Sequence, residues 1–257
     1  MFEWFYDFPL IFVFAAAAIL FAATTEFFAW IGRSLRPSGP EQAEIGTLTG
    51  AALGLLALLL GFSFSLALSR FDDRRHVVLE EANAIGTAAN YATMLPDPSR
   101  GDILRLLRTY ADVRLGIDIP HDAAKLQRDV ARSLQLQQAL WQQAATATAA
   151  APQSLAAYRF VAALNEMTNI HETRLTALRF HVPLPVVLML VGVAEVALGF
   201  TGYQTGTAGG HRRLAALIMA VTIAAVITEI VDLDRPARGL IQVPVQPLID
   251  ARDGIPQ

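Results

Sequence analysis

The sequence predicts an all-α membrane protein, with four transmembrane helices in two hairpins and a cytoplasmic helical bundle between the second and third. The 257 residues are 54% hydrophobic and 17% charged, whereas soluble domains average about 25% charged residues. Four stretches are apolar enough to cross a bilayer, which takes about 20 residues. The long polar stretch between the second and third repeats its apolar positions at helical spacing, and no strand-like alternation occurs.

Composition also excludes several classes of function. The net charge of -3 gives no electrostatic case for a nucleic-acid partner. The absence of cysteine removes disulfides, thiolate metal sites, iron–sulfur clusters and cysteine nucleophiles. The chain contains no P-loop, no G-x-S-x-G, no H-E-x-x-H and no dinucleotide-binding glycine pattern. We therefore expect no enzyme activity, no catalytic residues, no metal and no cofactor.

The predicted spans fall in two pairs, each joined by a link long enough only for a hairpin. Pro9 suits the start of the first span, because its missing N–H would be unpaired there in any case. A secretory signal peptide is excluded by the acidic residues Glu3 and Asp7 in front of the apolar run. The expected spans cover residues 8–31, 45–69, 184–203 and 214–231.

These spans divide the chain into four regions, which are 1–69, 70–182, 183–231 and 232–257. We expect long helices to run without a break through Ser69–Arg70 and through His181–Pro183. The termini and the middle region carry more membrane-proximal arginines than the two hairpin loops. The positive-inside rule therefore favours a multi-pass protein of the cell inner membrane, with its termini and middle region in the cytoplasm.

The second span carries a line of small residues at spacings of four and seven, which stay on one helix face. Such residues allow close approach between helices in lipid, where packing drives association. The line could pack against another span of the same subunit, or it could form a subunit interface around a pore axis. Its helix-packing members are Gly46, Gly50, Gly54 and Gly61.

The opposite face of the second span carries large apolar residues. Rings of such side chains in an oligomer would form a hydrophobic constriction that gates by dewetting. A lipid-facing line would have the same appearance in sequence. The pore or gate candidates are Leu55, Leu59, Phe62 and Leu66.

Glu195 lies slightly past the middle of the third span. A carboxylate at this depth is costly unless it is neutral, paired or facing water, so it marks a candidate ion or proton path. The alternative is a protonated glutamate that is hydrogen-bonded inside the helix bundle.

Asp72, His76 and Glu80 share one helix face just beyond the second span. In a symmetric oligomer they would line a vestibule and attract cations, and a metal site is a second possibility. The face could instead be solvated, with its acids paired to Arg70 and Arg75. His171 and His181 have no ligand-spaced partner and are expected to be ordinary residues.

Several stretches together resemble the bestrophin-like family of bacterial membrane proteins, a family defined by a domain of unknown function. They are "LALSRFDDRRHVVLEEANAIGTA" with "LLRTYADVRL", "LNEMTNIHETRLTALRFHVP" and "DLDRPARGLIQV". The family-motif residues are Glu81, Asn83, Asp234, Arg235, Pro236 and Gly239.

The resemblance extends more distantly to the bestrophins, which are homopentameric ion channels with a pore lined by the second span. It implies a homo-oligomer, a pentamer by analogy, that conducts small inorganic ions through the bilayer. Two other hypotheses remain open. One is a non-conducting scaffold or regulator acting through its cytoplasmic bundle, and the other is a proton-coupled transporter that uses Glu195.

Overall fold

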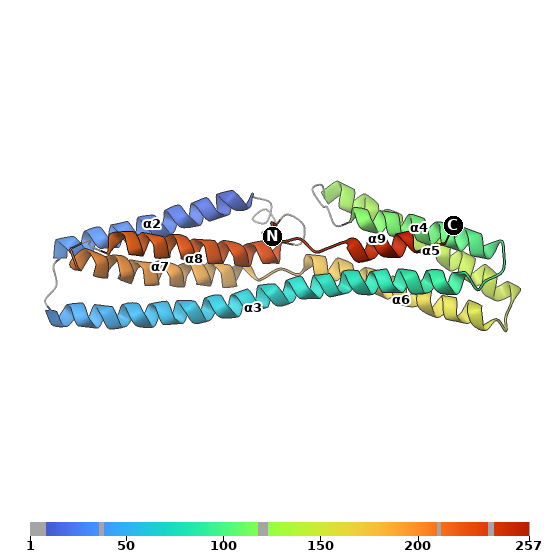
Figure 1. Ribbon diagram of the computed structural model, residues 1–257, viewed down its shortest axis with the longest axis horizontal. Coiled ribbons are helices and arrows are strands. Elements are labelled where there is room, and N and C mark those ends of the chain that lie inside the picture. Colours follow the sequence, from blue (N-terminus) through green and yellow to red (C-terminus); the bar gives the residue numbers. More distant parts are fainter. Residues whose placement is uncertain (1–8, 36–38, 118–122, 210–211, 236–238, 257) are drawn as a thin grey trace. The chain divides into compact units, whose positions relative to one another are not determined.

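The structure is a computed structural model that describes residues 9–35, 39–117, 123–209, 212–235 and 239–256. Every regular element in these ranges is an α-helix, as the sequence predicts (Figure 1). Four helices are long and apolar enough to cross a membrane. The predicted all-α class with four membrane-spanning helices is therefore confirmed. The chain divides into two compact units, which we describe separately.

Unit 1 contains residues 1–69, 181–235 and 239–241. Its helices are α2 (Leu10–Leu35), the first part of α3 (Gly39–Ala92), α7 (Leu184–Thr207) and α8 (Arg213–Asp234). Their buried side chains form one apolar core, which includes Phe21, Leu56, Ala194, Leu198 and Ala224.

The closest helix contact in unit 1 joins α2 to α7 through small residues. A Cβ on Gly202 would lie 2.2 Å from the backbone oxygen of Thr25, and a Cβ on Gly206 would lie 2.1 Å from that of Ala29. Two small residues four apart on each helix therefore let the backbones touch, as is common between helices in lipid. This contact, rather than the glycines of the second span, is the tight small-residue packing within the chain.

Helix α3 passes Ser69–Arg70 without a break, as predicted, and the part from Arg70 onward belongs to unit 2. The second predicted continuity is wrong. Helix α6 (Leu155–Arg179) ends where Phe180 adopts an extended backbone, with φ -82° and ψ 120°. Helix α7 begins only at Leu184, after Pro183. Proline removes an amide donor and disfavours the helical conformation in the residue before it, which accounts for the interruption.

Unit 2 contains the end of α3 together with α4 (Ser99–Gly116), α5 (Ala123–Ala150), α6 and α9 (Gln246–Asp253). Its core gathers large side chains from all five helices, including Ile85, Tyr110, Leu140, Phe160 and Leu248. The C-terminal segment is held on α4, where Arg108 donates to the carbonyl of Ile255 and Arg252 contacts Asp112 at 3.4 Å.

Replacing Gly202 by alanine is expected to destabilise the protein by about 1–3 kcal/mol, the usual range for overpacking. The destabilisation should lie at the upper end of this range, because the new methyl group meets backbone atoms that cannot move aside. Gly192→Ala on the same helix is the matched control, since a Cβ there meets nothing within 4 Å. Thermal unfolding in detergent measures both variants, and equal melting temperatures would contradict the α2–α7 contact.

Candidate functional site

Helix α3 buries only one face against the rest of unit 1. Leu56 is 2% exposed, and Thr49, Ser63 and Ala67 lie on the same buried side. The predicted gate residues lie away from it. Leu55 is 51% exposed, Phe62 is 67% exposed and Leu66 is 38% exposed, whereas Leu59 is half-buried.

The glycine line of α3 is also uncovered. Among the described residues, a Cβ added at Gly50, Gly54 or Gly61 would meet nothing within 4 Å, whereas one at Gly46 would lie 3.3 Å from the Gln204 side chain. The interpretation that these glycines pack within the subunit therefore receives no support at three of the four positions. Their surroundings within the chain leave room for another helix.

Glu195 on α7 is tied to α2. The hydroxyl of Thr24 donates a hydrogen bond to its Oε2, and its Oε1 is buried without a partner among the described residues. This carboxyl group therefore lies within the helix packing of unit 1. The arrangement matches the alternative of a hydrogen bond inside the bundle. The nearby Glu26 forms a more exposed ion pair with Arg213, with 2.6 Å between Oε1 and Nε.

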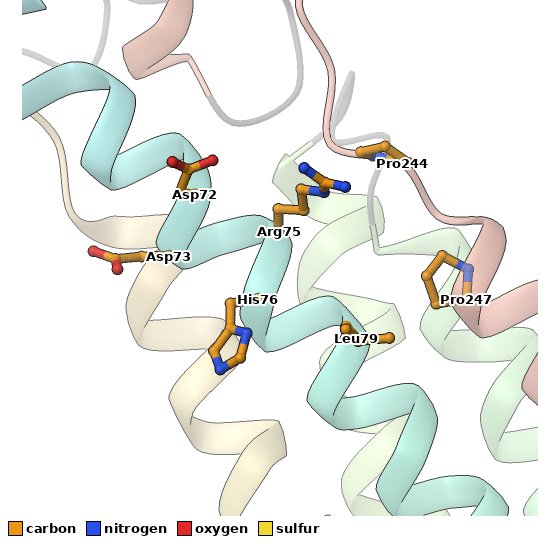
Figure 2. Close-up of a pocket in the computed structure, with 7 residues that line it drawn as sticks. All are labelled: Asp72, Asp73, Arg75, His76, Leu79, Pro244 and Pro247. Atoms are coloured by element: carbon orange, nitrogen blue, oxygen red, sulfur yellow. The ribbon is translucent and has the colours of Figure 1, made fainter. Parts of the chain in front are cut away.

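Two of the three predicted vestibule residues lie along α3 in unit 2 beside an open groove of about 580 Å³. Asp72 and His76 border this groove, which the C-terminal segment bounds through Pro244 and Pro247 (Figure 2). His76 and Glu80 pair at 3.1 Å across one helical turn, and both are accessible.

The other interpretations of this face receive little support. No ion pair joins its acids to Arg70 or Arg75 in the described part of the chain. Over the same ranges, no group of three or more histidine or acidic side chains is placed to hold a metal ion.

The most deeply buried charges in unit 2 surround Glu81, a residue of the predicted family motif. Its Oε1 accepts from Nε of Arg114 on α4, and its Oε2 accepts from Nη1 of Arg174 on α6. Glu81 and Arg114 are 0% exposed, and Arg174 is 2% exposed. One carboxylate therefore holds α3, α4 and α6 together.

A second group of buried polar side chains adjoins these charges. Tyr110 lies one turn before Arg114, and its ring centroid is 5.9 Å from the Arg114 guanidinium carbon. Gln137 donates to the Tyr110 hydroxyl at 3.2 Å, and that hydroxyl lies 3.4 Å from Nδ1 of His171. Burial raises the pKa of Tyr110 to about 12, because the phenolate would lose its hydration. The hydroxyl therefore keeps its proton under all physiological conditions.

Residues 239–241, which begin with the glycine of the Asp-Arg-Pro-x-x-Gly motif, contact Asp232 at the end of α8 in unit 1. The buried carboxylate of Asp232 accepts from the amide of Leu240 at 2.9 Å and from that of Ile241 at 3.1 Å. A Cβ on Gly239 would lie 2.4 Å from Oδ1 of Asp232, so a side chain at this position would collide with the acid. The backbone of residues 239–241 therefore satisfies a buried acid.

Asp234 contacts the residues that connect α6 to α7. Its Oδ2 accepts from the amide of Val182 at 2.8 Å, and its backbone oxygen lies 3.2 Å from Nδ1 of His181. The motif residues Asp234 and Arg235 are both buried, whereas Pro236 lies outside the described residues. Asn83 is exposed beside a smaller groove that Glu80 and Glu166 also line.

The sequence singles out Glu81 as a motif residue but does not reveal its partners. Arg114, Arg174 and His171 occur in the stretches that carry the family resemblance, yet no spacing rule connects residues on different helices. His171, which the sequence left without a role, is fully buried and borders the Glu81 group through Tyr110. An arginine inside an otherwise apolar helix face is the signal that could have revealed Arg114, because its neighbours Leu107 and Ala111 are core residues.

Replacing Glu81 by glutamine is expected to destabilise the protein by about 3–5 kcal/mol, because it removes the charge that two buried arginines share. Glu80→Gln is the control at the adjacent position, where loss of the exposed pair with His76 should cost at most about 1 kcal/mol. Thermal unfolding compares the two variants. Equal losses of stability in the two variants would mean that the folded state of unit 2 does not depend on the Glu81 carboxylate.

Comparison with known proteins places this geometry in a family. The model of the bestrophin-like domain matches residues 15–248. A crystal structure of a mutant bacterial bestrophin homologue from Klebsiella pneumoniae has a TM-score of 0.70 and 14% identity, covering 95% of this chain and 97% of that chain. A second structure of a homologue from that organism, phased by Zn-SAD, has a TM-score of 0.67 and 14% identity, covering 96% and 97%.

The search of curated proteins found no match. Identities this low show a shared fold, whereas the family model spans almost the whole chain from the first predicted span to α9. The chain therefore belongs to the bestrophin-like family.

Proposed function

We propose that this protein is a homo-oligomeric channel that conducts small ions through a pore lined by α3. The observation that carries the proposal is the pair of uncovered faces on α3 in unit 1. One face carries Gly50, Gly54 and Gly61, which have no close neighbours among the described residues, and the other carries large apolar side chains. A single chain leaves these glycines uncovered and leaves Leu55, Phe62 and Leu66 exposed.

The glycine face supports assembly with further copies of the chain. Lipid tails can cover leucine and phenylalanine, but small residues in a membrane helix serve close contact with another helix. In the described part of the chain, no atom lies within 4 Å of a Cβ added at Gly50, Gly54 or Gly61. A neighbouring copy supplies such a helix, and closed rotational symmetry then arranges the copies around a central axis.

The apolar face supports a constriction on that axis. With one side of α3 held by the core around Leu56 and another by the neighbouring copy, the side that carries Leu59 and Phe62 faces the centre. Rings of these side chains narrow the path and hold back water, which is how hydrophobic gates close. Beyond the membrane, the accessible Asp72, His76 and Glu80 line the exit and favour cations.

Membership of the bestrophin-like family adds independent support. The bestrophins to which this family is related are pentameric channels, so five copies are the expected number by analogy.

The double substitution Leu59→Ala/Phe62→Ala is expected to increase ion flux several-fold over wild type, because shorter side chains widen the constriction and ease its wetting. Flux is measured with purified protein in liposomes. Leu188→Ala/Val196→Ala on α7 is the matched control, since these side chains are also large, apolar and exposed. It should leave flux unchanged.

The variants Glu80→Gln and Glu195→Gln then separate the two acidic candidates. If only Glu80→Gln loses the preference for cations, the vestibule determines selectivity. If only Glu195→Gln changes the ion flux or its preference for cations, the ions follow a path along α7. No flux from wild type or from the α3 variant, across several ions and pH values, would refute the channel and favour a scaffold.

Gly54→Leu is expected to reduce the oligomer to smaller species, because a large side chain fills the space that a neighbouring helix requires. Gly192→Leu is the control at an equally open position on α7. Light scattering coupled to size-exclusion chromatography measures the mass in detergent. An unchanged assembly in Gly54→Leu would remove the glycine line from the subunit interface.

A further inference from the structure

The guanidinium of Arg114 has more hydrogen-bond donors than the protein around it has acceptors. Its Nε donates to Glu81, but Nη1 and Nη2 are both buried and have no acceptor among the described residues. The whole side chain is 0% exposed. Four N–H bonds of a charged group therefore point into the interior of unit 2 without partners.

Both carboxylate oxygens of the neighbouring Glu81 already accept hydrogen bonds from atoms other than the Arg114 Nη atoms. Glu81 offers one oxygen to Nε of Arg114 and the other to Nη1 of Arg174. Because arginine stays protonated at any physiological pH, Arg114 keeps its full charge in this setting. The Nη atoms of Arg114 therefore lack hydrogen-bond acceptors, and the site lacks a negative charge.

The other groups nearby do not supply an acceptor. The Tyr110 hydroxyl accepts from Gln137 and lies 3.4 Å from Nδ1 of His171. Nε2 of His171 is buried and, among the described residues, forms no hydrogen bond with the Nη atoms of Arg114.

A small anion meets this requirement better than water does. Water can accept hydrogen bonds from the Nη atoms, but it does not balance the second positive charge that Arg114 and Arg174 bring to the single carboxylate of Glu81. The surrounding core residues Leu107, Ala111 and Ile85 are 0% exposed. They limit the occupant to a compact inorganic ion rather than a peptide or a metabolite.

We propose that the Nη1 and Nη2 atoms of Arg114 bind a small monovalent inorganic anion, such as a halide, in the core of the unit 2 helix bundle. The bound anion completes the charge arrangement that Glu81 begins, and it stabilises the packing of α3 and α4. This site is independent of the proposed pore. It acts on the stability of the folded state whether or not the protein conducts ions.

The test begins with full-length protein purified and dialysed in sodium gluconate, an anion too large for the site. Gluconate is then replaced stepwise by chloride at constant ionic strength and pH. Because a ligand that binds only the folded state raises its stability, the melting temperature should rise and saturate with chloride concentration. A melting temperature that does not depend on the chloride fraction would overturn the proposal.

Two matched variants assign the effect to the site. Arg114→Lys keeps a positive charge beside Glu81 but lacks the paired Nη donors, so the chloride-dependent rise should be lost. Arg105→Lys lies on the same helix at an exposed position and should retain the full rise. A rise that persists in Arg114→Lys would place the anion elsewhere and overturn the assignment.

A direct observation decides the matter if Arg114→Lys does not fold. Crystals of the wild-type protein grown in bromide should give an anomalous peak within hydrogen-bonding distance of the Arg114 Nη atoms. Anomalous peaks confined to the protein surface, with none beside Arg114, would refute the site.

Discussion

The carboxylate of Glu81 is the interaction on which the arrangement of unit 2 depends. Three helices that are distant in sequence each place one charged side chain at the same buried point, with Arg114 from α4 and Arg174 from α6. Breaking a buried pair by removal of one member is far more costly than its net contribution to stability suggests. The consequence is a bundle whose helices are held in one register relative to α3 rather than packed through interchangeable apolar side chains.

Buried acids play a related role in unit 1, but their partners are backbone amides. Asp232 binds the amides of Leu240 and Ile241, and Asp234 binds the amide of Val182. The first acid accepts from two amides at the end of α8, and the second accepts from an amide in the interrupted chain before α7. Both parts of the molecule therefore use carboxylates at the points where helices end or converge, since apolar contacts alone lack direction.

Helix α3 connects these structural features to the proposed pore. Its buried side contributes Leu56 to the unit 1 core, and its continuation contributes Glu81 to unit 2. A helix fixed in this way can present its remaining faces to other copies of the chain in a defined orientation. The tight packing of the same subunit occurs elsewhere, at Gly202 and Gly206 on α7, which leaves the glycines of α3 available.

The sequence by itself determined the fold class, the approximate spans and the family, because hydrophobic length and helical periodicity are local properties of the chain. It also singled out Glu81 and the Asp-Arg-Pro-x-x-Gly segment, although not what they contact. Only the tertiary structure brought Arg114, Arg174 and His171 to Glu81, since these residues are separated by up to 93 positions. It also decided which glycines pack within the chain, because a line of small residues has the same spacing whether its partner is the same subunit or another copy.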